Sequence, residues 1–269
     1  MAIHRAAALV FCLVALASTT ASAYPGGTPA YVTDIAPFCA SCHSSASEDQ
    51  LQGMPPARVT AELAANKHLA KIRTPPPDSA YVKLSAADRE ALAAAVEKLD
   101  AGTSVKLTAP ATAKAGAEIE VVVETVGGSA PVLGVALVDA ISRNQSAPIS
   151  ARGWLVVGKP VVIGPDGKPQ TKFTDGRNPS LPPGTSYVNI DGIDTDAAAG
   201  KFAKTKTTWK LRAPAQAGKV PLVAVMLYGT ETGSPHGAVE TPYGKQPLGG
   251  FTGSSGRVKF SAVATVDVQ

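Results

Sequence analysis

The sequence predicts a helical N-terminal part followed by an all-β sandwich. In residues 24–102, apolar side chains recur at helical spacing and proline-rich joints separate the segments. In residues 103–269, short β-branched runs alternate with Gly, Pro, Asn and Asp, which is typical of antiparallel strands joined by turns. The change in pattern falls at Gly102 and Thr103, so we expect one domain on each side of it.

The first 23 residues have the features of an export signal. Arg5 gives a basic tip, an apolar run extends from Ala6 to Ala17, and the small residues Ala21-Ser22-Ala23 form a cleavage site. The run is shorter than the roughly 20 residues that cross a bilayer, and no later stretch resembles a transmembrane segment. We therefore predict a signal peptide at residues 1–23, a periplasmic or otherwise exported protein, and no integral membrane segment after cleavage.

Two main helices are expected in the N-terminal part. One should start at Ser85, which can cap it while Asp88 reaches back, and its buried face is predicted to carry Leu92, Val96 and Leu99. The other is expected over Arg58–Ile72, and the prolines at 75–77 should prevent its continuation.

The β part contains seven runs that we predict to be strands, separated by turn residues. Long surface loops are expected at 173–186 and 234–256, which are rich in Gly and Pro. The predicted strands are Ile119–Val126, Val132–Val138, Trp154–Val157, Val161–Ile163, Thr207–Leu211, Val220–Tyr228 and Val258–Val268.

The segment Cys39-Ala40-Ser41-Cys42-His43 has the C-x-x-C-H pattern of covalent haem attachment. Two thiols at this spacing can reach the two vinyl carbons on one edge of a single macrocycle, and the next residue can offer an imidazole to the iron. Because Cys12 leaves with the signal peptide, Cys39 and Cys42 are the only cysteines of the mature chain. We predict one covalent haem c, with His43 as the proximal iron ligand.

Three other uses of the cysteine pair are less consistent with the sequence. Structural zinc requires four ligands, and no second Cys/His pair supplies them. A thioredoxin-like pair belongs at the start of a helix after a strand, which the flanking residues do not resemble. A disulfide across two intervening residues closes a very short loop and stabilises little.

Around this motif, residues 30–99 resemble a small class I cytochrome c. A mid-chain helix follows the motif, and Tyr81-Val82-Lys83-Leu84-Ser85 leads into a closing helix. In that family, a Met followed by Pro, in a loop before the last helix, usually supplies the sixth iron ligand. The corresponding stretch here, Arg73-Thr74-Pro75-Pro76-Pro77, contains no Met.

Two residues are therefore candidates for the distal iron ligand. His68 lies on an Ala-lined stripe of the expected helix, where small neighbours would allow close approach to the porphyrin. Met54, in Gly53-Met54-Pro55-Pro56, is the alternative, and an open sixth position is the third possibility. Thioether ligation would give a higher reduction potential than a second His.

The β part contains no recognisable catalytic motif. Trp209-Lys210-Leu211-Arg212-Ala213-Pro214 followed by Val220–Tyr228 resembles the late strands of immunoglobulin-like or reeler-like domains, which implies a binding or scaffold role. The net charge of +4, which includes Arg5 of the signal, is spread along the chain and does not indicate nucleic acid.

Together these features predict an all-α cytochrome c-like domain followed by an all-β immunoglobulin-like sandwich. The expected function is one-electron transfer by a periplasmic mono-haem c-type cytochrome, with the sandwich docking redox protein partners. No substrate chemistry is required, so an electron carrier is favoured over an enzyme. The alternative is a redox-enzyme subunit or a small-ligand sensor with an open sixth iron position.

Overall fold

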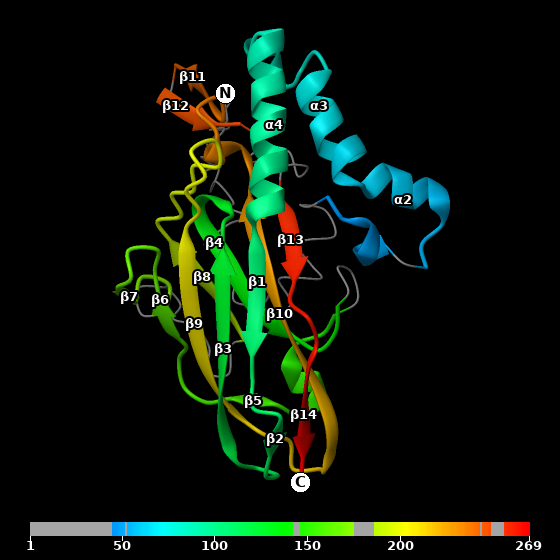
Figure 1. The fold of residues 1–269 in the computed structure, drawn as a ribbon, viewed down its shortest axis with the longest axis vertical. Helices are drawn as coiled ribbons and strands as arrows, with labels where there is room; N and C mark the ends of the chain where they lie inside the picture. The colour runs from blue at the N-terminus through cyan, green and yellow to red at the C-terminus, as the bar shows by residue number, and fades with distance from the viewer. Residues whose placement is uncertain (1–44, 52, 142–145, 175–185, 243, 249–255) are drawn as a thin grey trace, which may run out of the picture.

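The computed structural model describes the chain from Ser45 to the C-terminus, with five internal gaps. Cys39, Cys42, His43 and the predicted signal peptide lie outside the described residues. Helices come first in the described chain, and two β-sheets packed as a sandwich follow (Figure 1). The described ranges are 45–51, 53–141, 146–174, 186–242, 244–248 and 256–269.

Three α-helices and several short turns form the helical segment. α4 begins as predicted, because the Ser85 hydroxyl oxygen accepts a hydrogen bond from the Asp88 N–H at 3.1 Å. Its predicted inner face, Leu92, Val96 and Leu99, is fully buried. The elements are η2 (Glu48–Leu51), α2 (Pro56–Glu62), η3 (Ala65–Leu69), α3 (Ala70–Arg73), η4 (Ala80–Lys83) and α4 (Ala86–Gly102).

The prediction of one continuous helix over Arg58–Ile72 is wrong. Leu63 adopts an extended conformation (ψ 141°) and forms a parallel bridge with Ala46. The Ala46 N–H donates to Glu62 O at 2.9 Å, and the Ala64 N–H donates to Ala46 O at 3.3 Å. This pairing diverts backbone groups from the helix, which ends at Glu62 and resumes as the π-helical turn η3 before α3.

Two six-stranded sheets follow α4, which ends at Gly102 where the sequence pattern changes. The first sheet, here sheet 1, has the order β1 (Ser104–Thr108), β3 (Glu118–Val126), β9 (Lys204–Arg212), β6 (Val161–Ile163), β7 (Pro169–Gln170), with β5 (Leu155–Val156) also on β9. Sheet 2 has the order β2 (Thr112–Ala113), β14 (Ala264–Val268), β10 (Gly218–Gly229), β4 (Ser129–Val138), β8 (Tyr187–Asp191), with β13 (Arg257–Phe260) also on β10.

Strands occur at all seven predicted runs, with two corrections. The run Val258–Val268 forms two strands, β13 and β14, that pair separately with β10. The break is at Ser261, whose side-chain oxygen accepts the Ala224 N–H at 2.9 Å. The predicted loop at 234–256 contains the hairpin β11 (Ala238–Thr241) and β12 (Gly244–Pro247), and η5 (Ile149–Arg152) and η6 (Glu231–Gly233) complete the fold.

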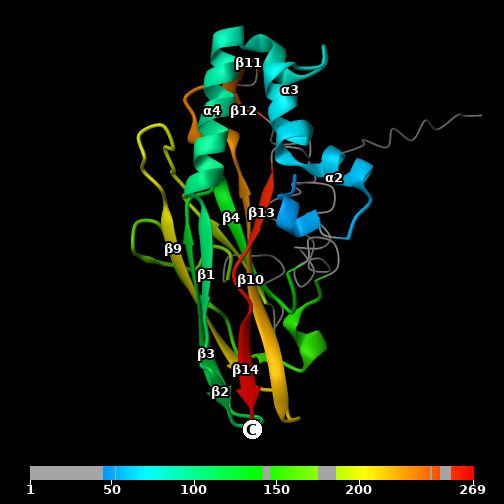
Figure 2. The ribbon, with the colours of Figure 1, turned by 45° about the vertical axis from the view of Figure 1, so that its right-hand side comes forward.

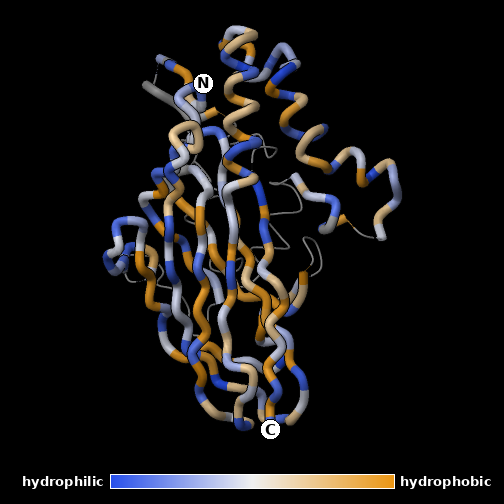
Figure 3. Tube along the Cα trace, viewed as in Figure 1, coloured by the Kyte–Doolittle hydropathy of each residue, from blue (hydrophilic) through white to orange (hydrophobic). Residues whose placement is uncertain are grey.

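The main core lies between the two sheets. Trp154 and Trp209 are fully buried there. Trp209 lies on β9, where alternate residues of the strand point to opposite faces of the sheet. On β9, Trp209 and Leu211 point inward while Lys206 and Lys210 are exposed, and Figure 3 shows this alternation along the strands.

A smaller core joins the helices. α4 continues almost directly into β1, and α3 lies beside α4 (Figure 1). No helix in the described part of the chain is both long and apolar enough to cross a membrane. The buried residues of this core are Leu69, Ile72, Tyr81, Leu92, Ala93, Val96 and Leu248.

Candidate haem-binding site

The described chain starts two residues after His43, and this flank of the haem motif is firmly attached. Ser45 is buried and forms a parallel bridge with Arg257 of β13. The Ser45 N–H donates to Gly256 O at 3.2 Å, and the Arg257 guanidinium donates to the Ser45 hydroxyl oxygen at 2.6 Å. With the Ala46–Leu63 bridge, these bonds join the flank to both the edge of sheet 2 and the helical segment.

The turn η2 adds a second attachment on the same side. The Gln50 side-chain amide donates to Val258 O of β13 at 2.7 Å, and Leu51 is buried. Figure 2 shows α2, which follows this turn, on the side of β13. Residues 45–51 therefore lie along the edge of sheet 2.

A charged cluster fixes this edge to the end of α4. Arg257 is 6% exposed and its Nε donates to Asp100 at 2.8 Å, while the Lys259 ammonium donates to the backbone oxygen of Thr103 at 2.7 Å. Cations at a helix C-terminus interact favourably with its free carbonyls. Burial and the nearby Asp100 carboxylate raise the pKa of Tyr228, whose hydroxyl donates to Asp100 at 3.0 Å.

Met54, one of the two distal candidates, follows η2 at the start of α2. It is partly buried, and its N–H donates to Leu51 O at 3.2 Å. Gly53 precedes it with φ 79°, a left-handed conformation that glycine adopts without strain. Met54 therefore lies on the same attached segment as the flank of the haem motif.

His68, the other distal candidate, is fully buried and already bonded. Its Nε2 lies 2.6 Å from Glu231 Oε1 and 3.3 Å from the Tyr81 hydroxyl oxygen. Tyr81 and Thr230 also donate to the Glu231 carboxylate. Among the described residues, His68 Nδ1 has no hydrogen-bond partner. To bind iron through Nε2, His68 would have to give up its 2.6 Å hydrogen bond to the buried Glu231 carboxylate.

Glu231 was not among the residues predicted from the sequence. It follows the long apolar strand β10 in Gly229-Thr230-Glu231-Thr232-Gly233, which has the composition of an exposed turn. It is instead 3% exposed, in η6, at the junction of the helices and the sandwich. Burial by itself would raise the pKa of Glu231, but the charge of His68 and hydrogen bonds from His68, Tyr81 and Thr230 lower it below its usual value.

This lowered pKa predicts a loss of stability in acid. The ionised Glu231 is favoured in the folded state, so its contribution is present above the pKa of the unfolded chain and is lost as the pH falls through the folded pKa. We expect the urea midpoint to fall as the pH drops below 4.5, the pKa of an unperturbed Glu. In Glu231→Gln this group no longer titrates, so the urea midpoint should depend less on pH. An unchanged pH dependence would show that Glu231 is not the group responsible for the loss of stability in acid.

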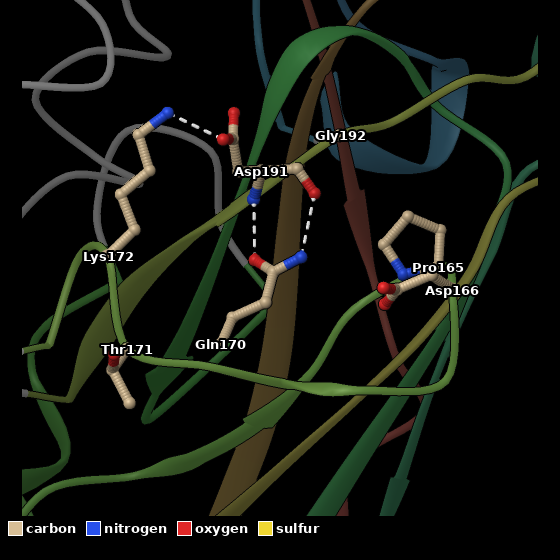
Figure 4. A pocket seen from close by; sticks show the side chains of 7 residues that line it. All are labelled: Pro165, Asp166, Gln170, Thr171, Lys172, Asp191 and Gly192. Atoms are coloured by element: carbon tan, nitrogen blue, oxygen red, sulfur yellow. Dashed lines mark hydrogen bonds and ion pairs between the residues drawn. The ribbon is translucent and has the colours of Figure 1, made fainter.

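An open hollow elsewhere on the sandwich has no comparable chemistry. It lies beside the β6–β7 hairpin, and Figure 4 shows the Gln170 amide paired with the backbone of Asp191 at 2.9 and 3.0 Å. Lys172 forms an ion pair with the Asp191 carboxylate at 2.5 Å. These groups satisfy one another, so we interpret them as a link that fixes the hairpin to β8.

The functional assignment rests on the C-x-x-C-H motif and on the geometry, because the comparisons with known proteins found no match. No protein-family model matches the chain, and no curated protein is similar to it in sequence. Within the described residues, no group of three or more His, Cys, Asp or Glu side chains is arranged to hold a metal ion.

Proposed function

We propose that this protein is an exported mono-haem c-type cytochrome that transfers single electrons. The observation that carries the proposal is Cys39-Ala40-Ser41-Cys42-His43 behind an export-type leader. Bound haem would supply the one-electron chemistry, while Cys39 and Cys42 would hold its edge and His43 would ligate the iron. In this proposal residues 24–102 form a cytochrome c-like domain.

The residues after the motif support this function. A covalent haem needs a rigid flank, since movement of the proximal ligand would change the iron environment. Ser45 is fixed by backbone and side-chain bonds to β13, and Gln50 is bonded to the same strand. Met54 is close in sequence to these attachments, and His68 is engaged by Glu231. We therefore favour Met54 over His68 as the sixth ligand.

For the sandwich we propose an immunoglobulin-like fold and a role in docking a redox partner. Two mostly antiparallel sheets packed over one core support this fold. The outer face of β9 carries the exposed residues Lys204, Lys206 and Lys210, a basic stripe that could steer an acidic partner. Carboxylates on the neighbouring strand β3 lie opposite these lysines and reduce the net charge of the basic stripe.

The choice between Met54 and His68 predicts different spectra for two variants. We expect Met54→Ala to remove the weak far-red band of the oxidised protein and to lower the reduction potential, because thioether ligation raises it. His68→Ala should keep that band and lose stability instead, because Glu231 would remain buried without its partner. Visible and near-infrared absorption spectra check both predictions. If His68→Ala became high-spin while the spectrum of Met54→Ala stayed unchanged, His68 and not Met54 would be the sixth ligand.

An open sixth position is the second candidate, in keeping with a redox-enzyme subunit or a small-ligand sensor. If Met54 does not bind iron, the sixth position stays open, because His68 is already bonded to Glu231. Rapid carbon monoxide binding to the reduced wild-type protein would support this candidate. Slow binding, limited by release of Met54, would support the electron carrier.

A further inference from the structure

Residues 65–83, here called the flap, form a segment with little internal support. The flap consists of the π-helical turn η3, the four-residue helix α3 and the 3-10 turn η4, with a proline-rich turn between α3 and η4. Helices this short are not stable in water by themselves. The structure of the flap therefore depends on what its buried side chains contact. These are His68, Leu69, Ile72 and Tyr81.

The chain changes direction at both ends of the flap. Leu63 lies between α2 and η3, and Leu84 lies between η4 and α4. Both have extended backbones, with ψ angles of 141° and 145°, although helical turns lie on either side of them. Residues at the ends of elements are the positions that absorb the φ/ψ changes of a hinge. The flap is thus bounded by two hinge positions about which it can turn as one unit.

The helix α4, which lies beside the flap (Figure 1), is attached to the sandwich independently of the flap. The Lys98 ammonium donates to Ala198 O at 2.9 Å. Two residues further along the helix, the Asp100 carboxylate accepts a hydrogen bond from the Arg257 guanidinium at 2.8 Å. None of these groups belongs to the flap, so α4 would stay in place if the flap opened.

Two of the four buried side chains of the flap bond to the same residue of the sandwich. His68 Nε2 lies 2.6 Å from Glu231 Oε1, and the Tyr81 hydroxyl donates to the same oxygen at 2.5 Å. The other two, Leu69 and Ile72, belong to the small apolar core that the flap shares with α4. A buried polar group that loses its partner costs free energy, so both bonds to Glu231 oppose opening of the flap.

Glu231 is itself held in place by the sandwich. Its neighbour Thr232 bonds through its hydroxyl to the hydroxyl of Ser129 on β4. The Ser234 N–H donates to Glu231 O at 3.0 Å. The chain then folds back so closely that a Cβ at Gly237 would clash with this same oxygen, a close approach that glycine permits. The carboxylate therefore projects from a fixed turn, relative to which the flap can move.

We propose that the flap is a hinged cover over α4 that opens and closes as one unit, and that Glu231 is the latch that keeps it closed. Opening would release both side chains that bond to Glu231 in a single step. It would also uncover the apolar face of α4 beneath the flap, which includes Leu92 and Val96. The movement needs no haem, so this inference is independent of the proposed function.

Native-state hydrogen exchange of the full-length wild-type protein tests for the flap and needs no variant. Amides of the flap should exchange through one shared opening that depends only weakly on low concentrations of urea, because little surface is exposed when the flap opens. Amides of β9 and β10 should require a larger opening with a steeper dependence on urea. If the flap amides exchange only together with those of the strands, the flap does not open by itself and the inference is wrong.

Two isosteric variants test the latch in the same experiment. Glu231→Gln removes the buried charge, and Glu90→Gln makes the same change at an exposed carboxylate that pairs with Arg73 of the flap. In Glu231→Gln the flap amides should exchange faster by on the order of 10- to 100-fold, because hydrogen bonds to a buried charged group are weakened. In Glu90→Gln they should change little, because solvent screens exposed pairs. Equal effects of the two variants would show that Glu231 is not the latch.

Discussion

Replacing Cys39 and Cys42 together with alanine is expected to abolish covalent haem attachment. In the proposed cytochrome each thiol would form one thioether bond to a vinyl carbon, so the double variant would keep only the weaker coordination by His43. Mass spectrometry of the intact exported protein should show the apo mass alone, and acid–acetone extraction should remove any remaining colour. The wild-type protein should retain its haem under the same treatment.

Ser41→Ala is the matched control for this experiment. Ser41 lies between the cysteines and forms no bond to the haem in the proposed arrangement, so this variant should keep both the haem mass and the spectrum. A wild-type protein exported without haem, with Cys39 and Cys42 joined to each other, would contradict the cytochrome proposal and return the pair to a redox or structural role.

Glu231→Ala is expected to destabilise the protein by about 3–5 kcal/mol, because removal of one partner of a buried ion pair leaves the other without compensation. His68 and Tyr81 would both lose their acceptor in an interior that water does not reach. The measurement is urea unfolding followed by circular dichroism, with the loss appearing as a lower midpoint.

Two further variants test whether the loss of stability comes from the broken pair or from the removal of a side chain in general. Glu90→Ala removes an exposed partner of Arg73 and should leave the midpoint nearly unchanged, because solvent screens such pairs. His68→Ala combined with Glu231→Ala should cost less than the sum of the single changes, because neither charge is then left alone. Additive losses would show that His68 and Glu231 do not stabilise each other.

Local patterns predicted most of the secondary structure. The start of α4 follows from Ser85 and Asp88, and its buried face follows from the spacing of Leu92, Val96 and Leu99. The strands at the seven predicted runs follow from β-branched segments between turn residues, whereas β1, β2, β7, β8 and the hairpin β11–β12 were not predicted. Local patterns failed at Leu63, where the helix is interrupted by pairing with Ala46, and at Ser261, where one predicted strand becomes two.

The candidate site also combines features that the sequence predicts with features that only the structure shows. The C-x-x-C-H motif needs only five consecutive residues, so Cys39, Cys42 and His43 could be proposed from the sequence alone. The state of His68 depends on Glu231, which is 163 residues away. No periodicity relates two such residues, and only the packing of η6 against the helical segment brings them together.

The sequence by itself determined the haem motif, the export-type leader and the change from helices to strands, because each is encoded by neighbouring residues. The tertiary structure decided what surrounds the motif. Ser45 meets Arg257 only because β13 pairs with β10. The outer face of sheet 2 is recognised as buried only when strands from distant parts of the chain are assembled side by side. These features depend on long-range pairing and burial, which local sequence patterns do not specify.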